Sequence, residues 1–463
     1  MSERSSYTEY RNIRAPTQNS RDLFLKENLL LKKLLGVASA TAFIVLFAFA
    51  LRMAYLGRGI LFTGSFAYGA ETGAVAAAIA SGKGFSSPLP QITVGPTAWL
   101  TPIYPYLLAG IFKLGGIFTS KSLLAIRLLD MFFSALTCWP LRRAATIAFG
   151  KRVGTASAWL WAVLPDAIFY PVIWVWDTAL TGLCLTALFA ATLKIRGSSR
   201  MASWIGYGAL WAFSAMVNPS VLSVLPFLAI WAIWPLRAQL TLALKLALMA
   251  SVIFMAGIAP WSIRNYVVFH RFIPFRSTFG LVLWLGNNPE VPDTWAPFLY
   301  PSDNPEEAAK YARMTEIPYM EEKQSEALAF MRTHPRDSMR FFFRRFAHNW
   351  LGVWDAPADM WRFMPSFMKL TLFWNCLFSV LSFVGAFFAY RARSETALPF
   401  ASVMLMFPMV YYMTNTSGRY RYPMDPIMAI LTVFAIAYPL SQLGKRTFGK
   451  LWAAESEKAI YAR

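Results

Sequence analysis

The stretch from residue 66 to residue 106 reads FAYGAETGAVAAAIASGKGFSSPLPQITVGPTAWLTPIYPY. It follows the first apolar run long enough to cross a membrane. Its many Gly, Pro and aromatic residues are typical of an ordered loop rather than of a plain spanning helix. Its single acidic side chain is Glu71 and its single basic side chain is Lys83. We predict that this stretch is the first outer loop of a polytopic membrane protein, and that Glu71 does chemistry at the membrane surface.

The composition of the whole chain agrees with a membrane location. Of its 463 residues, 57% are hydrophobic and only 15% are charged, values outside the usual range of soluble proteins. Apolar runs that approach or reach the roughly 20 residues needed to span a bilayer recur along the chain. They lie at 34–56, 153–171, 178–193, 240–261, 368–390, 398–414 and 426–443. The sequence therefore predicts an all-α integral membrane protein with about ten transmembrane helices.

The formal net charge of +20 comes from basic residues dispersed in short loops between apolar runs. Basic loops are typical of the cytoplasmic side of a membrane protein, and this dispersal argues against nucleic-acid binding. The three cysteines, Cys138, Cys184 and Cys376, lie in apolar segments and form no disulfide or metal-binding pattern. We expect the polar, basic N-terminal segment not to be a cleavable signal peptide, because the apolar run that follows it is long enough to remain as an anchor.

Charge and composition divide the chain into five parts. We predict a cytoplasmic basic tail at 1–33 and an N-terminal transmembrane region at 34–261, whose first outer loop covers 57–122. An extracytoplasmic, mostly helical module at 262–367 holds 12 of the 24 acidic residues, and we expect helices in it at 318–333 and 337–350. Further transmembrane helices at 368–443 and a cytoplasmic tail at 444–463 complete the chain. The apolar segment 102–118 either spans the membrane or lies half-embedded at its outer face. We favour the second reading and assign the next crossing to 122–141.

Six short stretches carry a resemblance to a known family: Glu71–Phe85 (ETGAVAAAIASGKGF), Pro96–Pro105 (PTAWLTPIYP), Trp174–Leu180 (WVWDTAL), Pro260–Phe269 (PWSIRNYVVF), Gly280–Pro289 (GLVLWLGNNP) and Gly418–Pro426 (GRYRYPMDP). Each falls at a predicted outer edge. In this order they resemble the polytopic glycosyltransferases of the C superfamily (the GT-C fold), in particular the bacterial relatives of protein O-mannosyltransferases and aminoarabinose transferases.

The resemblance implies an enzyme that takes a sugar from a polyprenyl phosphate at the extracytoplasmic face and transfers it with inversion to an acceptor. The family places one acid in the first outer loop and a second acid in the next outer turn. Asp177 matches the second acid. The position of the first falls near Ala67, and Glu71 lies one helical turn later. Either Glu71 takes over this role, or the loop is threaded differently.

Such a transfer needs a base that aims the acceptor hydroxyl and cations that receive the leaving phosphate. We therefore predict Glu71 and Asp177 as catalytic residues. The predicted substrate-binding residues are Arg419, Arg421, Tyr420, Arg264 and Lys83. Each has a plainer alternative. Glu71 caps a helix or pairs with Lys83 or Arg58, Asp177 caps the helix that follows it, and the arginines extend from the membrane interface into water.

No Walker loop, dinucleotide fingerprint or HExxH pair occurs, and His270, His334 and His348 lack ligand spacing. The sequence thus requires no cofactor, although a divalent metal at Asp177 stays open. Arg127 and Asp130, three residues apart, are expected to form an internal ion pair. The expected partners are a polyprenyl-phosphate-linked sugar, an unknown acceptor and the lipids of the cytoplasmic (inner) cell membrane. Alternative functions are a transporter or flippase of a lipid-linked sugar, and an oligosaccharide ligase or polymerase of the same fold.

Overall fold

The computed structural model describes residues 41–57, 65–89, 92, 95–292, 294, 296–352 and 366–447. Within these residues the regular structure is helical, apart from isolated bridges between Ser86 and Pro96 and between Leu89 and Ile92. The predicted all-α class is confirmed. The predicted tail at 1–33 lies outside the described residues, as does most of the tail predicted at 444–463.

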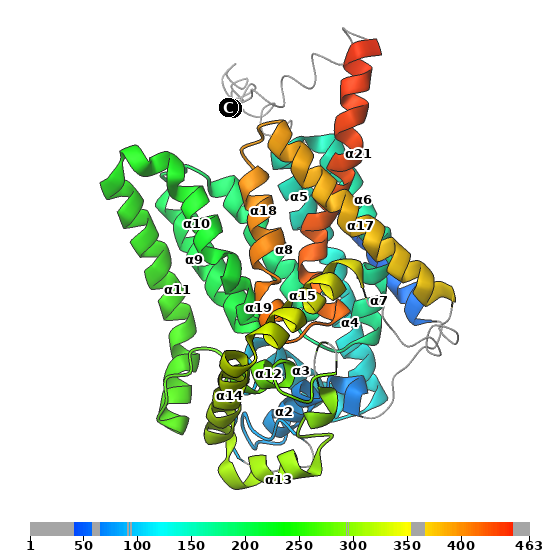
Figure 1. Ribbon diagram of the computed structural model, residues 1–463. Helices are drawn as coiled ribbons and strands as arrows, with labels where there is room; N and C mark the ends of the chain where they lie inside the picture. Colours follow the sequence, from blue (N-terminus) through cyan, green and yellow to red (C-terminus); the bar gives the residue numbers. More distant parts are fainter. Residues whose placement is uncertain are drawn as a thin grey trace, which may run out of the picture.

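A bundle of long helices forms the body of the protein (Figure 1). It begins with an apolar helix over Thr41–Leu56. It continues with α4 (Ser120–Leu136), α5 (Cys138–Phe149), α6 (Lys151–Val163), α7 (Pro165–Ile173), α8 (Thr178–Ile195), α9 (Met201–Val217), η2 (Pro219–Val224), α10 (Leu225–Ile233), η3 (Trp234–Ala238) and α11 (Leu240–Phe269). The C-terminal helices are α17 (Ser366–Arg391), α18 (Ala397–Met406), α19 (Met409–Met413), α20 (Gly418–Arg421), η5 (Tyr422–Met424) and α21 (Asp425–Thr447).

Six helical segments of the described chain are long and apolar enough to cross a membrane, or seven if the bent pair α6–α7 counts as one span. The protein is therefore a multi-pass membrane protein. Shorter apolar helices at Thr41–Leu56, Met201–Val217 and Ala397–Met413 are further candidates, so the total of about ten stays a prediction. The crossing predicted at 122–141 is part of a longer span, Ser120–Phe149, because α5 continues α4 almost without interruption.

The remaining helices gather at one end of the bundle, the lower end in Figure 1, which we call the loop end. They are η1 (Ser65–Tyr68), α2 (Glu71–Ala80), α3 (Ile103–Gly115), α12 (Phe279–Gly286), η4 (Pro297–Leu299), α13 (Pro305–Met314) and α14 (Glu316–Thr333). From α14 the chain continues into α15 (Pro335–Leu351), which runs obliquely across the middle of the bundle in Figure 1 and contacts α17 and α19. The helices predicted near 318–333 and 337–350 are confirmed by α14 and α15. With 13 residues, α3 is about 20 Å long, too short to cross a bilayer unaided.

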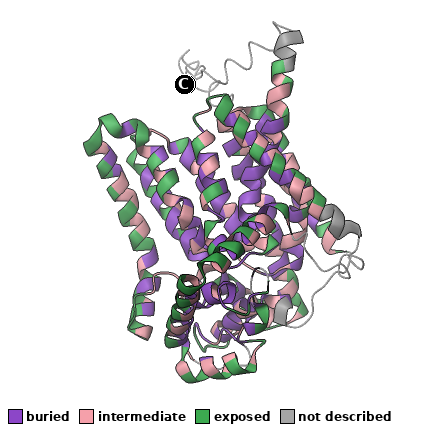
Figure 2. Ribbon diagram, in the orientation of Figure 1, coloured by how far each residue is buried: buried purple, intermediate pink, exposed green. Residues whose placement is uncertain are grey.

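The first outer loop and the predicted module share one apolar core. Leu89 and Trp99 of the loop pack in a single cluster with Leu281, Tyr311 and Phe341. Figure 2 shows that buried residues also fill the interior of the bundle, while α11 at its edge is largely exposed. Because these segments, distant in sequence, bury a common apolar surface, the loop is fixed in place at the loop end of the bundle.

Candidate functional site

A cavity of about 290 Å³ lies at the loop end, between α2, the start of α8 and the α20 turn. Four predicted site residues line it: Glu71, Asp177, Arg419 and Tyr420. Other lining residues come from the loop, the module and the bundle, including Trp99, Tyr104, Trp176, Asn218, Arg276, Phe279, Tyr300, Asp303 and Tyr411. Three carboxylates (Glu71, Asp177 and Asp303) and two guanidinium groups (Arg276 and Arg419) from distant parts of the sequence thus meet around one space.

Glu71 is the first residue of α2, and its carboxylate accepts a hydrogen bond from the hydroxyl group of Tyr300. Burial, and next the charge of Glu71, raise the pKa of the Tyr300 phenol well above its ordinary value. Tyr300 therefore remains a hydrogen-bond donor that orients Glu71. Lys83 is exposed and lies outside the lining of the cavity, so it is not the partner that the plainer reading gave to Glu71. Arg58 lies outside the described residues.

Asp177 occupies the N-cap position of α8, but its side chain makes no capping hydrogen bond. Its carboxylate instead accepts a hydrogen bond from the Asn218 amide at 3.0 Å. Burial raises the pKa of Asp177, while the charges of Arg276 and Arg419 act in the opposite direction. The carboxylate thus faces the cavity between two cations rather than serving as a helix cap.

Arg419 lies over the indole ring of Trp176, with its guanidinium carbon 3.9 Å from the ring centroid. It donates a hydrogen bond to the Tyr420 hydroxyl at 3.2 Å. The Tyr420 ring stacks on Tyr411 at a centroid distance of 4.6 Å. These contacts hold the Arg419 guanidinium group against an aromatic ring. Its remaining nitrogen atoms are free to bind an anion.

Arg421 does not reach this cavity. Its guanidinium lies in the bundle core, where it donates to Asp425 at 3.0 Å and approaches Asp166 at 3.5 Å. Asn375 accepts a further hydrogen bond from it at 2.8 Å. Residues two apart in a short helix point to opposite sides, so α20 presents only one of its two arginines to the cavity. The placement of Arg421 therefore gives no support to its predicted role in substrate binding.

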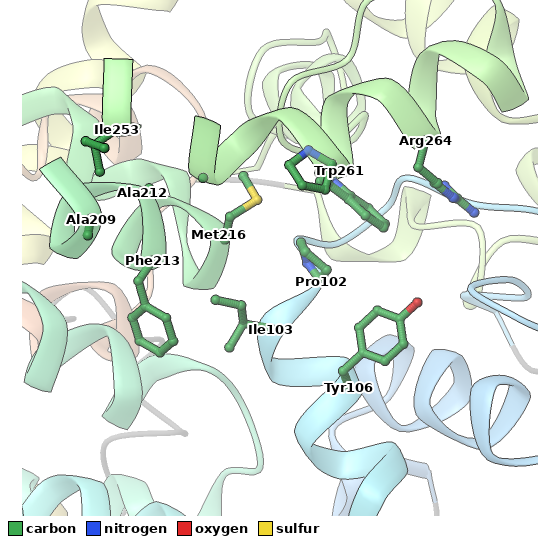
Figure 3. Close-up of a pocket in the computed structure, with 12 residues that line it drawn as sticks. Pro102, Ile103, Tyr106, Ala209, Ala212, Phe213, Met216, Ile253, Trp261 and Arg264 are labelled. Atoms are coloured by element: carbon green, nitrogen blue, oxygen red, sulfur yellow. The ribbon is translucent and has the colours of Figure 1, made fainter. Parts of the chain in front are cut away.

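A second, larger hollow of about 610 Å³ is an open apolar groove between α3, α9 and α11. Figure 3 shows Ile103 and Tyr106 of α3 below Trp261 of α11, with Arg264 at the end away from Ala209. Arg264 donates hydrogen bonds to the carbonyl oxygens of Thr97 at 2.7 Å and Phe85 at 3.0 Å. Those acceptors are uncharged, so the positive charge of Arg264 remains at the end of the groove.

The two hollows lie on opposite sides of one segment. Pro102, Ile103 and Tyr106 line the groove, whereas Thr101 and Tyr104 line the cavity. The Thr101 hydroxyl donates to the Val217 carbonyl oxygen at 2.7 Å, which pins this segment to the end of α9. Residues 101–106 therefore separate the groove from the cavity.

Sequence reasoning missed Arg276, Tyr300 and Asn218. Each is an isolated polar residue in a loop without a motif around it, and only folding brings it beside Glu71 or Asp177. The expected ion pair between Arg127 and Asp130 is also wrong. The two Asp130 oxygens accept hydrogen bonds from Tyr104 at 2.9 and 2.7 Å, while two buried nitrogens of Arg127 have no hydrogen-bond partner.

The sequence left a divalent metal at Asp177 as an open expectation. Among the described residues, no group of three or more His, Cys, Asp or Glu side chains lies close enough together to hold a metal ion. In the described part of the chain Asp177 has Asn218 as its hydrogen-bond partner and two arginines nearby. A divalent metal at Asp177 therefore stays a prediction.

Known structures share this architecture. The archaeal oligosaccharyltransferase AglB from Archaeoglobus fulgidus, in complex with an inhibitory peptide and a dolichol-phosphate, superposes with a TM-score of 0.55 at 14% identity. The match covers 88% of this chain and 51% of that chain, so this chain spans about half of the archaeal enzyme. Its apo form gives a TM-score of 0.54 at 15% identity, over 92% of this chain and 52% of that chain.

The chain has the GT-C fold. The same archaeal enzyme has also been solved in complex with Zn and sulfate, with a TM-score of 0.53 at 14% identity, over 91% of this chain and 51% of that chain. ArnT from Cupriavidus metallidurans bound to undecaprenyl phosphate gives a TM-score of 0.38 at 15% identity, over 89% of this chain and 81% of that chain. No protein-family model and no curated protein sequence matches this GT-C chain.

Proposed function

We propose that the protein is a membrane glycosyltransferase that moves a sugar from a polyprenyl-phosphate donor to an acceptor hydroxyl group. The observation that carries this proposal is the convergence of Glu71, Asp177, Arg276 and Arg419 on one cavity at the end of a membrane bundle. A base and a cation for the leaving phosphate are the two elements that such a transfer needs.

The donor chain would occupy the groove between α3, α9 and α11. The groove is lined mostly by apolar side chains, opens toward the surroundings of the bundle and has Arg264 at one end. The cavity lies next to the groove, on the other side of residues 101–106. The isoprenoid tail would therefore lie in the groove, Arg264 would attract the passing phosphate, and Arg276 and Arg419 would bind it beside the carboxylates.

The proposed chemistry is a single displacement. Glu71, oriented by Tyr300, takes the proton from the acceptor hydroxyl as its oxygen attacks the anomeric carbon. The bond between that carbon and the phosphate oxygen breaks, and its electron pair leaves with the polyprenyl phosphate. Arg276 and Arg419 stabilise the charge that develops on this phosphate. Attack opposite the leaving group inverts the anomeric configuration. No step is assigned to a metal.

The distribution of charge supports an extracytoplasmic site. At the end of the bundle opposite the cavity, Arg196 pairs with Glu395 at 3.2 Å, and Trp231 donates to the Glu395 carbonyl oxygen at 3.1 Å. These contacts join three turns that also carry Lys194, Arg200, Arg237, Arg391 and Arg393. A basic end of this kind faces the cytoplasm of most membrane proteins, so the cavity would open on the other side of the cell membrane.

The direct test offers the purified protein polyprenyl-phosphate sugars and candidate acceptors, and measures donor consumption and product. We expect transfer by the wild type and at least a tenfold loss with Glu71→Gln or Asp177→Asn, about 1.4 kcal/mol. Turnover unaffected by either substitution would refute the site. Movement of a lipid-linked sugar across vesicles without consumption would instead identify a transporter.

The groove has its own test with a matched control. Ala209 is an exposed residue that lines the groove on α9, and Ala202 is an exposed residue of the same helix outside its lining. Ala209→Trp should fill the groove and raise KM for long-chain donors at least tenfold, whereas Ala202→Trp should leave it unchanged. Equal KM values for the two variants would mean that the donor chain binds elsewhere.

A further inference from the structure

Glu316 lines neither the cavity nor the groove. It connects the segment that contacts Arg264 with the segment that carries Arg276. It is the first residue of α14, and only 3% of its surface is exposed. Thr97, Ala98, Ser277 and Tyr311 all donate hydrogen bonds to its carboxylate. The distances to its oxygens are 2.7 Å from the Ala98 amide, 2.7 Å from the Ser277 hydroxyl and 3.3 Å from the Tyr311 hydroxyl.

One side of this arrangement leads to the groove. Thr97 donates its hydroxyl to Glu316, and its carbonyl oxygen accepts the hydrogen bond from Arg264 at 2.7 Å. The position of the Arg264 guanidinium at the end of the groove therefore depends on where Glu316 holds Thr97.

The other side leads to the cavity. Ser277 donates its hydroxyl to Glu316 and its backbone amide to the Ala98 carbonyl oxygen at 2.8 Å. Its neighbour in sequence is Arg276, which lines the cavity and faces Asp177. Glu316 thus fixes the backbone from which the Arg276 side chain extends.

We infer that Glu316 is a positioning residue that sets Arg264 at the groove and Arg276 in the cavity relative to each other. A polyprenyl phosphate that binds at Arg264 is thereby held where it can move on to Arg276. This inference rests on the proposed function. It predicts that donor binding and the rate of transfer both depend on a side chain that touches neither donor nor acceptor.

A carboxylate suits this role better than an amide. All four donors point at two acceptor oxygens, and glutamine offers one oxygen and one NH₂ group. With glutamine at 316, either the Ala98 amide and Ser277, or Thr97 and Tyr311, would face a donor instead of an acceptor. The Ala98 amide in particular has no other orientation to adopt. Glu316→Gln therefore preserves size while it weakens one side of the arrangement.

The test measures binding of polyprenyl monophosphate to the full-length protein in zwitterionic lipid nanodiscs, together with kcat and KM for transfer. For Glu316→Gln we expect at least a tenfold increase in Kd and at least a tenfold decrease in kcat. The matched control is Glu322→Gln, on the same helix, where the carboxylate is more exposed and pairs with Lys310 at 2.7 Å. It should change neither quantity more than twofold.

Two milder variants separate the two sides and remain informative if Glu316→Gln folds poorly. Thr97→Val should mainly raise Kd, because it acts on the Arg264 side. Ser277→Ala should mainly lower kcat, because it acts on the Arg276 side. A structural role alone would reduce thermal stability without this split between Kd and kcat.

The outcomes distinguish the two proposals. If the wild type binds polyprenyl phosphate and transfers sugar, and Glu316→Gln does so with unchanged Kd and kcat, the positioning role is refuted and the proposed function stands. Equal effects of Thr97→Val and Ser277→Ala on both quantities also refute it. If the wild type neither binds nor turns over any such lipid, the proposed function fails and the inference fails with it.

Discussion

The side-chain amide of Asn218 donates a hydrogen bond to Asp177 across 3.0 Å, while its carbonyl oxygen accepts the backbone N–H of Ser220, also at 3.0 Å. Both ends of the amide are therefore committed, and its NH₂ group can only face the carboxylate. Asn218 ends α9, so this contact fixes the second predicted acid of the cavity to a different helix of the bundle.

Asn218→Asp tests this contact without removing the cap, because an aspartate oxygen can still accept from Ser220. The substitution places a second carboxylate beside Asp177 and removes a donor from it. We expect kcat/KM for sugar transfer to fall at least tenfold, about 1.4 kcal/mol. Initial rates measure the effect, and unchanged rates would show that the ionised form of Asp177 is not required.

Glu71 and Tyr300 form the other acid–donor pair of the cavity. Loss of a general base reduces rates by roughly 10²–10⁴-fold, and we expect Glu71→Gln to fall in this range. Tyr300→Phe removes only the orienting hydroxyl, so a loss of about tenfold in kcat with little change in KM is expected. Single-turnover rates with saturating donor check both variants. A larger loss for Tyr300→Phe than for Glu71→Gln would contradict the proposed roles.

Arg276 provides a prediction about pH. Burial raises the pKa of Asp177, and Arg276 is the first of the groups that lower it. Arg276→Gln removes that charge, so the pKa of Asp177 rises and more of the carboxyl is protonated at a given pH. The acidic limb of the kcat/KM profile should therefore move to higher pH. Arg271→Gln serves as the control, since its exposed pair with Glu321 lies outside the lining of the cavity. A shift of equal size in both variants would rule out the interaction between Arg276 and Asp177 as its cause.

Arg421 provides a prediction about stability. It is the cation between Asp166 and Asp425, whose side chains are 8% and 1% exposed. Arg421→Met leaves two buried carboxyl groups without it, and breaking a buried pair costs about 3–5 kcal/mol. Thermal or denaturant titration in detergent measures this loss as a change in the free energy of unfolding. Arg340→Met at the exposed pair with Asp337 should cost under about 1 kcal/mol. Similar losses for both variants would mean that the Arg421 cluster contributes no more than a surface pair.

Gly418 provides a prediction about the placement of Arg419. A Cβ atom at position 418 would lie 2.3 Å from the Tyr170 hydroxyl oxygen, so Gly418→Ala must displace one of them. We expect the α20 turn to shift and kcat/KM to fall several-fold. The double variant Gly418→Ala/Tyr170→Phe lacks the clashing oxygen and should recover most of the activity. Absence of recovery would indicate that glycine is required here for another reason.

Much of this arrangement could be predicted locally. The lengths of the apolar runs determine a multi-pass helical protein, and α14 and α15 lie close to their predicted ranges. Glu71 is distinguished in the sequence as the only carboxylate in an apolar loop, whereas Asp177 is predicted from the resemblance, as the second acid. Both line the cavity. A lone charge at the edge of an apolar segment is costly unless it is used, and this signal is present in the sequence itself.

The sequence by itself therefore determined the membrane class and the helical segments, because hydrophobic length is a local property of the chain, and it distinguished Glu71 by its isolated charge. Only the tertiary structure decided which of Arg419 and Arg421 faces the cavity, and that Tyr300, Arg276 and Asn218 belong beside the acids. The side of a short helix that faces a cavity depends on what packs against it. Here the Trp176 ring lies under the Arg419 guanidinium, and Asp166 and Asp425 form ion pairs with Arg421. Trp176 and Asp166 lie far from the two arginines in the sequence, and only the contact between Arg421 and Asp425, four residues apart, is local. A local pattern alone therefore does not encode the choice.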